Sequence, residues 1–178
     1  MTTVPRELET ERLHLRQFRD ADLDGYAAIM ADPEVMRFLG GKPYDRAQSW
    51  RHMAVTLGHW ALRGFGVWAL EEKCSGRLVG RAGLNAYEGW PGLEVAWTLG
   101  REYWGRGYAT EAARVALTQA FETLGRDHVI NLIDSANTPS IRVAERIGER
   151  LEGPQPFHGM VVQRYGMHRD QYLRSSQD

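Results

Sequence analysis

The stretch from Trp104 to Glu111, which reads Trp-Gly-Arg-Gly-Tyr-Ala-Thr-Glu, is the part of this 178-residue chain whose residue types most directly indicate chemistry. Its two glycines, Gly105 and Gly107, allow backbone conformations that other residues rarely adopt. Successive N–H groups can then point at one anion, and a helix that opens near Ala109 would add the positive end of its dipole. The stretch therefore predicts a binding site for a phosphate-sized anion.

Two other interpretations of this stretch are considered. An isolated Gly-x-Gly is often only a tight turn between a strand and a helix. A nucleotide-phosphate site is the other, but Thr110 stands where a dinucleotide fingerprint has its third glycine, and the Gly-Lys-Ser/Thr of a P-loop is missing. These absences weaken the nucleotide interpretation.

The elements around the loop follow from the apolar pattern. A strand is expected over Leu93–Leu99 before the loop, and an alanine-rich helix over Glu111–Leu124 after it. A strand at His128–Ile133 and a helix from Asn137 to Gly148 come next, with Thr138 as a candidate cap and Pro139 at the first helical position. This order predicts a right-handed crossover in a mixed sheet.

The rest of the chain is expected to supply the remaining layers. Helices are predicted from Asp20 to Met30, at Pro33, and over Asp45–Leu62, and strands over Arg12–Phe18, Phe65–Leu70, Leu78–Leu84, around Arg150–Leu151 and over Val161–Tyr172. Gly153–Gly159 is expected to be a loop.

Composition limits the classes of function. Residues 1–178 fit one domain with a real core, and a net charge of −1 offers no basic surface for nucleic acid or an anionic membrane. No apolar run is long enough for a signal peptide or membrane span, so a soluble cytoplasmic protein is expected. The single cysteine, Cys74, falls in a predicted turn and is expected to be an ordinary surface residue rather than a nucleophile.

The glycine loop resembles the pyrophosphate-binding signature of the GNAT N-acetyltransferases, Gln/Arg-x-x-Gly-x-Gly/Ala. Gly107 and Ala109 fill the small positions, and Trp104 replaces the leading residue. The ribosomal-protein-acetylating (RimJ/RimL-like) branch tends to read Trp-Gly-x-Gly-Tyr-Ala-Thr-Glu-Ala, and this chain continues with Ala112. Further stretches similar to that branch are Leu8–Leu13 with Leu15-Arg16, Asp32–Met36, Gly76–Gly80 and Asn137–Gly148.

This resemblance implies the GNAT fold, an α/β (α+β) arrangement with a mixed, mostly antiparallel sheet of six to seven strands and about four helices on both faces. One departure stands out, since Glu149 follows Gly148 where the family usually has an aromatic residue. That departure puts the local packing in doubt. The family often forms dimers, so a homodimer is an option.

The resemblance also implies acetyl-CoA as donor and a primary amine as acceptor, with the acetyl group transferred directly and without an acyl-enzyme intermediate. The implied cofactor-binding residues are Trp104, Gly105, Arg106, Gly107, Tyr108, Ala109 and Thr110 for the pyrophosphate, and Ala96, Trp97, Thr98, Leu99 and Asn137 for the pantetheine arm. Ser140 is the implied hydrogen-bond donor or proton relay to the departing sulfur, and its alternative role is an ordinary first-turn serine. Tyr108 is more typical of a structural residue than a catalytic one.

Glu94, at the start of the strand before the loop, is the candidate base, and its alternative is a surface strand glutamate. Deprotonating a lysine-like amine at pH 7 costs roughly 4 to 5 kcal/mol, whereas an α-amine costs about 1 kcal/mol. An α-amine acceptor could therefore manage with a weak base.

The acceptor pocket and its substrate are less constrained. Its expected walls are Trp50, Trp60, Tyr87, Trp90 and His158, although tryptophans at helical spacing, as the first two are, more often belong to a core. The histidines do not cluster at metal-ligand spacing, so no metal is expected. The acceptor could be a protein N-terminus or a small amine such as an aminoglycoside or polyamine, and a non-catalytic acetyl-CoA-binding module is the alternative function.

Overall fold

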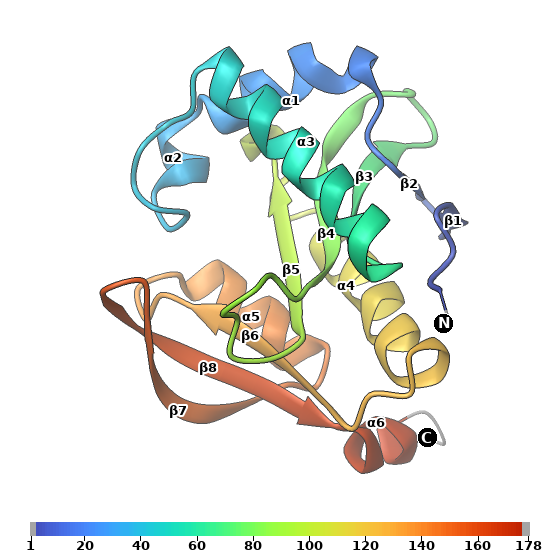
Figure 1. The fold of residues 1–178 in the computed structure, drawn as a ribbon, viewed down its shortest axis with the longest axis vertical. Helices are drawn as coiled ribbons and strands as arrows, with labels where there is room; N and C mark the ends of the chain where they lie inside the picture. The colour runs from blue at the N-terminus through green and yellow to red at the C-terminus, as the bar shows by residue number, and fades with distance from the viewer. Residues whose placement is uncertain (1–2, 176–178) are drawn as a thin grey trace.

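The computed structural model describes residues 3–175 and contains one eight-stranded sheet in the order β1-β2-β3-β4-β5-β6-β8-β7 (Figure 1). Its strands are β1 (Leu8–Glu9), β2 (Leu13–Arg16), β3 (Val67–Glu72), β4 (Leu78–Asn85), β5 (Glu94–Leu99), β6 (His128–Ile133), β7 (Arg150–Phe157) and β8 (Met160–His168). Neighbouring strands are antiparallel except β5 and β6, which are parallel. The predicted mixed, mostly antiparallel sheet is confirmed.

Helices cover both faces of this sheet. The helical segments are η1 (Asp20–Asp22), α1 (Leu23–Met30), α2 (Pro33–Met36), α3 (Arg46–Arg63), η2 (Arg101–Tyr103), α4 (Tyr108–Thr118), the π-helical η3 (Gln119–Thr123), α5 (Thr138–Arg146) and α6 (Arg169–Ser175). Within the described part of the chain, no helix combines the length and the apolar character needed to cross a membrane.

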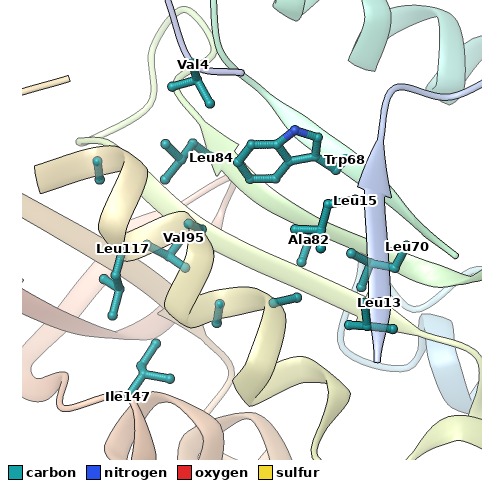
Figure 2. Close-up of a cluster of buried hydrophobic side chains, with 14 of the residues drawn as sticks. Val4, Leu13, Leu15, Trp68, Leu70, Ala82, Leu84, Val95, Leu117 and Ile147 are labelled. Atoms are coloured by element: carbon teal, nitrogen blue, oxygen red, sulfur yellow. The ribbon is translucent and has the colours of Figure 1, made fainter. Parts of the chain in front are cut away.

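The main core lies between the sheet and α4. Alanines of α4 let the helix approach the sheet closely, and Leu117 reaches the larger apolar side chains of the strands. Figure 2 shows Trp68, Leu84 and Val95 from the sheet in this cluster with Leu117. A second core, between the opposite face and helices α1 to α3, is built from Tyr26, Met30, Met36, Met53 and Ala69 among others.

Alternation along the strands decides which face each side chain takes. On β4, Ala82 and Leu84 join the α4 core, so Arg81 and Asn85 face the α1 and α3 side. Antiparallel register places Arg81 opposite Thr98 and Asn85 opposite Glu94. The sheet is therefore apolar toward α4 and carries a row of polar residues toward α1 and α3.

Three assignments made from the sequence are wrong, apart from shifts of a few residues at the ends of other elements. The predicted strand over Val161–Tyr172 is wrong beyond His168, because Arg169–Ser175 form α6, whose Tyr172 ring stacks on Phe121 at 4.9 Å. The predicted loop from Gly153 is also wrong as far as Phe157, since β7 runs to that residue. Its prolines are tolerated because β7 is an edge strand.

The cap of α5 is the third difference. Asn137, rather than Thr138, is the N-cap, and its side-chain oxygen accepts the Ser140 N–H at 3.3 Å. Thr138 is the first helical residue, so Pro139 lies one position later than expected. An asparagine oxygen is the more favoured cap, which explains the shift by one residue.

Glu149, the residue in place of the usual aromatic, is buried between α5 and β7 with 2% of its surface exposed. Neither of its carboxylate oxygens has a hydrogen-bond partner among the described residues. Burial raises the pKa of Glu149 to about 8, and the negative charges of Glu94 and Glu152 add to the shift. The chain therefore accommodates this carboxyl in its neutral form near neutral pH.

Replacing this buried carboxyl with an amide is expected to remove a pH-dependent loss of stability. Because the folded pKa of Glu149 lies above its unfolded value, this residue does not reduce stability below about pH 4.5, and the stability that it costs grows as the pH rises toward 8. Glu149→Gln should match wild type in thermal unfolding at pH 4.5 and exceed it by on the order of a few kcal/mol at pH 8.

The control is Glu145→Gln, an exposed glutamate four residues earlier, which should leave the pH dependence unchanged. Parallel stability curves for wild type and Glu149→Gln from pH 4.5 to 8 would contradict the assignment.

Candidate functional site

The loop between β5 and α4 has the backbone geometry that its glycines suggest. Gly105 and Gly107 both take positive φ angles, 74° and 84°. Gly107 is the N-cap of α4 and offers no side chain to cap it, so the first N–H groups of that helix have no side-chain acceptor. The helix begins at Tyr108, one residue before the expected Ala109, and its positive end is open to an anion.

Arg12, the residue just before β2, holds this loop in place, a role that the sequence analysis did not assign. Its Nη1 donates to the Arg106 carbonyl at 2.7 Å, and its Nη2 pairs with the Glu111 carboxylate at 2.6 Å. The guanidinium also lies over the Tyr108 ring, 4.7 Å from its centre. The loop conformation is therefore tied to the sheet before any ligand arrives.

The other loop side chains have mixed roles. The half-exposed Trp104 donates its indole N–H to the Leu99 carbonyl at 2.9 Å, and buried Tyr108 donates its hydroxyl to Glu72. Both side chains hold the loop in place. The Arg106 side chain is exposed, and its Nη1 lies 4.0 Å from a Glu72 carboxylate oxygen. Ala109 and Thr110 are half-buried in the first turn of α4.

The parallel strands β5 and β6 part almost at once (Figure 1). They share a single registered pair, Glu94 with Ile130, and the Ile130 N–H donates to the Leu93 carbonyl at 2.8 Å. Beyond that pair, the described part of β5 from Ala96 to Leu99, which includes Trp97 and Thr98, is paired only with β4. Its other edge therefore presents main-chain groups to a ligand.

Asn137 and Ser140 lie at the start of α5. The Asn137 oxygen is occupied by the Ser140 N–H, which leaves its amide N–H₂ group available as a donor. The Ser140 side chain is half-buried, and its hydroxyl makes no hydrogen bond to another described residue. Both groups can therefore still bind a ligand.

Glu94 is a buried residue, which excludes its alternative role as a surface glutamate. One of its oxygens accepts from Asn85 Nδ2 at 3.2 Å and from Trp90 Nε1 at 3.0 Å. Burial raises the pKa of Glu94, while the hydrogen bonds from Trp90 and Asn85 lower it and limit the shift. A raised pKa brings this carboxylate closer to the range in which it can accept a proton from a substrate.

Three of the expected pocket residues do come together beside Glu94. Tyr87 and Trp90 contact each other with ring centres 5.1 Å apart, and the Trp90 ring lies 5.7 Å from His158 and 4.8 Å from Phe157. His158 is exposed in the turn between β7 and β8.

The two tryptophans of α3 are placed elsewhere. Trp60 is buried against Trp68 and donates to the Val67 carbonyl, so its expected role in the acceptor pocket is wrong and it belongs to the core. Trp50 is 52% exposed and has no ring contact with Tyr87, Trp90 or His158 among the described residues. Helical spacing suggested that both tryptophans share one face of α3, but packing against the sheet buries Trp60 and leaves Trp50 exposed.

The structure also brings together histidines that are distant in sequence. His128 and His168 stack across β6 and β8 at 4.3 Å, and Glu152 approaches His128 Nε2 at 2.6 Å. The potential ligand atoms of these three residues lie within 4.8 Å of one another, although Arg164 pairs with the other Glu152 oxygen at 2.9 Å. Sequence spacing did not reveal this group, and the expectation that the protein needs no metal stays a prediction.

Arg81 is the second residue that the sequence analysis missed. It is buried beneath α1 and α3 on the same face as Glu94. The available signal was a charged residue inside the apolar run from Leu78 to Leu84, because an arginine is rarely buried unless it has a partner.

Taken together, the loop, the open edge and Glu94 lie along one strand. The distance from Glu94 to Leu99 along β5 is roughly 17 Å at the usual rise of a strand. An extended ligand could place an anionic group on the loop, pair its amides with β5 and bring its far end to Glu94.

Comparison with known proteins gives consistent findings. A sequence profile of the family described as Acetyltransferase (GNAT) domain matches residues 12–150. YkkB of Bacillus subtilis (strain 168) is 34% identical over 148 residues, covering 80% of this chain and 84% of that protein. The N-acetyltransferase p20 of Bacillus licheniformis is 28% identical over 148 residues, covering 82% and 83%. The crystal structure of the acetyltransferase from Agrobacterium tumefaciens str. C58 is 34% identical with a TM-score of 0.82, covering 93% and 95%.

The Trp90 hydrogen bond to Glu94 supplies a direct test of the site electrostatics. Because the indole N–H stabilises the carboxylate, Trp90→Phe should raise the pKa of Glu94 further above its usual range. A carbon-13 NMR titration of the glutamate carboxyl groups measures this shift. Trp50→Phe, which changes an exposed tryptophan of α3, should leave the Glu94 titration as in wild type, and an unchanged or lower pKa in Trp90→Phe would contradict the assignment.

Proposed function

The chain belongs to the GNAT acetyltransferase family, and we propose that it transfers an acetyl group from acetyl-CoA directly to a primary amine. The observation that carries this proposal is the early divergence of β5 from β6, with the glycine loop at the far end of β5. An open strand edge next to an anion site suits a carrier whose amide-rich arm ends in a diphosphate.

In this proposal the N–H groups from Arg106 to Thr110 bind the pyrophosphate, and Ala96 to Leu99 pair with the pantetheine arm. The free Asn137 amide donates to the same arm. The thioester then lies near the start of β5, where Glu94 is buried. The geometry of β5 supports this placement, because Glu94 lies at the start of the strand, the open edge follows, and the glycine loop comes after its end.

Glu94 takes the role of general base. It accepts the proton of the acceptor ammonium, directly or through water, and the free amine attacks the thioester carbonyl so that a C–N bond forms and the C–S bond breaks. The attacking nitrogen then loses its excess proton and the departing thiolate gains one, and the Ser140 hydroxyl is the proposed hydrogen-bond donor or relay for this transfer. The raised pKa of Glu94 leaves a smaller pKa difference to an α-amine than to a lysine-like amine.

The loop and the matching stretches support placement in the ribosomal-protein-acetylating (RimJ/RimL-like) branch. In this proposal the acceptor is a protein N-terminal α-amine or a small-molecule amine. A cytoplasmic location, a homodimer, and the absence of nucleic-acid and membrane partners remain predictions of the same interpretation.

Removing the proposed base should slow the acetyl-transfer step without weakening the binding of acetyl-CoA. Glu94→Gln is expected to lower kcat by roughly 100-fold or more, because general-base catalysis typically contributes 10²- to 10⁴-fold, with little change in KM for acetyl-CoA. In wild type, kcat/KM should rise with pH through the raised pKa of Glu94, and the variant should lose that rise.

The control is Glu88→Gln, a change at an exposed glutamate of the neighbouring loop. Coenzyme A release is followed with a panel of amines. Coenzyme A binding without turnover on any acceptor would instead support a non-catalytic binding module, and full activity of Glu94→Gln would remove Glu94 from the mechanism.

The glycine loop is tested by a pair of matched substitutions. Gly107→Val places a branched side chain at a φ of 84° and against the Arg12 guanidinium, so the loop must change shape and coenzyme A binding should weaken at least about 10-fold. Gly125→Val creates similar strain at a φ of 61° beyond the other end of the same helical segment. Among residues 3–175, apart from the two chain neighbours, no atom lies within 4 Å of the added carbon, so this variant should bind coenzyme A normally. Calorimetry measures both, and equal binding by the two variants would place the pyrophosphate elsewhere.

A further inference from the structure

Two arginines are buried in the described part of the chain, and only one of them is paired with carboxylates. Arg16, which is 4% exposed, forms a two-pronged pair with Asp22 through bonds of 2.7 Å and a further bond of 2.8 Å to Glu71. Arg81, which is 9% exposed, forms no ion pair with any described residue, and its Nε is buried without a partner. A buried guanidinium without a direct ion pair is costly, so its retention calls for a ligand.

The neighbours of Arg81 offset its charge only in part. The positive charge of Arg81 helps to lower the pKa of Glu94, but the two groups form no ion pair, and Glu94 accepts its side-chain hydrogen bonds from Asn85 and Trp90. On the helix side, Tyr26 bonds to His52 Nδ1 at 2.7 Å, and burial lowers the pKa of His52 to about 3 with a further contribution from the Arg81 charge. This histidine is therefore neutral, and the positive charge on this face belongs to Arg81.

Other polar atoms on the same face also lack partners. Asn85 Oδ1 and Thr98 Oγ1 are buried without a hydrogen bond to any residue that the structure describes. The register of β4 with β5 places these two residues at either end of the row that includes Arg81 and Glu94. Buried polar atoms are normally satisfied within the protein. A concentration of unsatisfied ones around a candidate base indicates that a polar ligand completes this face.

We infer that Arg81 binds a carboxylate of the acceptor, so that the substrate is an amino-acid-like molecule that carries both a primary amine and a carboxylate. This rests on the proposed function, in which Glu94 receives the proton from that amine. A guanidinium matches a carboxylate through two parallel hydrogen bonds, and the negative Glu94 on the same face attracts the ammonium. The two groups together complement a zwitterion and orient its amine.

The same charges argue against the other acceptors considered. A polyamine or an aminoglycoside would bring a second cation toward Arg81, where no described carboxylate is paired with the guanidinium. A peptide N-terminus would leave Arg81 without a counter-charge, unless its first side chain were acidic. Arg81 therefore selects the class of acceptor, while Glu94 accepts the proton that the reaction releases.

The test compares acceptors that differ only in the carboxylate. Coenzyme A release is measured for each common amino acid, for its carboxamide and for the corresponding amine without the carboxyl group, with β- and γ-amino acids added to measure the span. Plateau values of kcat/KM at high pH are used, so that the different pKa values of the amines do not enter. We expect the best amino acid to exceed its carboxamide by about 10- to 150-fold, the range of a charge-assisted hydrogen bond.

Variants assign that preference to the guanidinium. Arg81→Gln should bring the acid and the amide within a few-fold of each other, chiefly by lowering kcat/KM for the acid, and Arg81→Lys should retain an intermediate preference because it keeps the charge but not the fork. Arg63→Gln, which removes an exposed arginine at the end of α3, should behave as wild type. Thermal unfolding and coenzyme A binding verify that each variant is folded.

The outcomes separate this inference from the proposed function. A wild-type preference for carboxamides, polyamines or neutral peptide N-termini, or an acid-to-amide ratio unchanged in Arg81→Gln, overturns the inference and leaves acetyl transfer intact. If no amine is acetylated, calorimetry of amino acids with the coenzyme-A-loaded protein decides the matter. Binding that Arg81→Gln abolishes supports the carboxylate site while acetyl transfer fails, and no binding in wild type overturns both.

Discussion

The central constraint in this structure is the early divergence of two parallel strands. Parallel strands normally continue side by side and satisfy each other's main-chain groups. Here β5 and β6 share one registered pair, at Glu94 and Ile130, and then separate. One edge of β5 is therefore unpaired although the strand lies in the middle of the sheet, and the glycine loop and the start of α4 follow this strand in the chain. Continued pairing of β5 with β6 would satisfy these main-chain groups within the protein, so the divergence leaves them for a ligand.

The two faces of the sheet divide the remaining work. The face toward α4 is packed with apolar side chains and alanines, which hold the helix and its N-terminus in a fixed position relative to β5. The opposite face carries two register pairs, Arg81 with Thr98 and Asn85 with Glu94, which are separated on that face by the pair of Gly83 and Ala96. Strand alternation makes this division possible, because consecutive residues of β4 and β5 serve a core on one side and a polar surface on the other. Stability and recognition thus use the same two strands without sharing side chains.

Buried charge is handled in three ways in this chain. Arg16 is paired with carboxylates of its own protein, whereas Glu149 is accommodated by a raised pKa that keeps it neutral. Arg81 and Glu94 follow neither course fully, since Arg81 forms no ion pair with a described residue and Glu94 accepts its side-chain hydrogen bonds from neutral donors. Three of the buried atoms that lack a hydrogen-bond partner in the described part of the chain, on Arg81, Asn85 and Thr98, belong to the face where an acceptor would bind.

The sequence by itself determined the local features of this protein. Glycines at the loop, an alanine-rich helix after it and alternating strands are written in residue types and spacing, because backbone freedom and burial patterns act over a few residues. The open loop, the crossover and the position of Glu94 on a strand before the loop could therefore be predicted. Tertiary structure decided what spacing cannot encode, namely which side chains from distant strands meet. Arg12 at the loop, Trp60 in the core, α6 packed on Phe121, and Arg81 across from Thr98 all depend on register and packing between segments far apart in the chain.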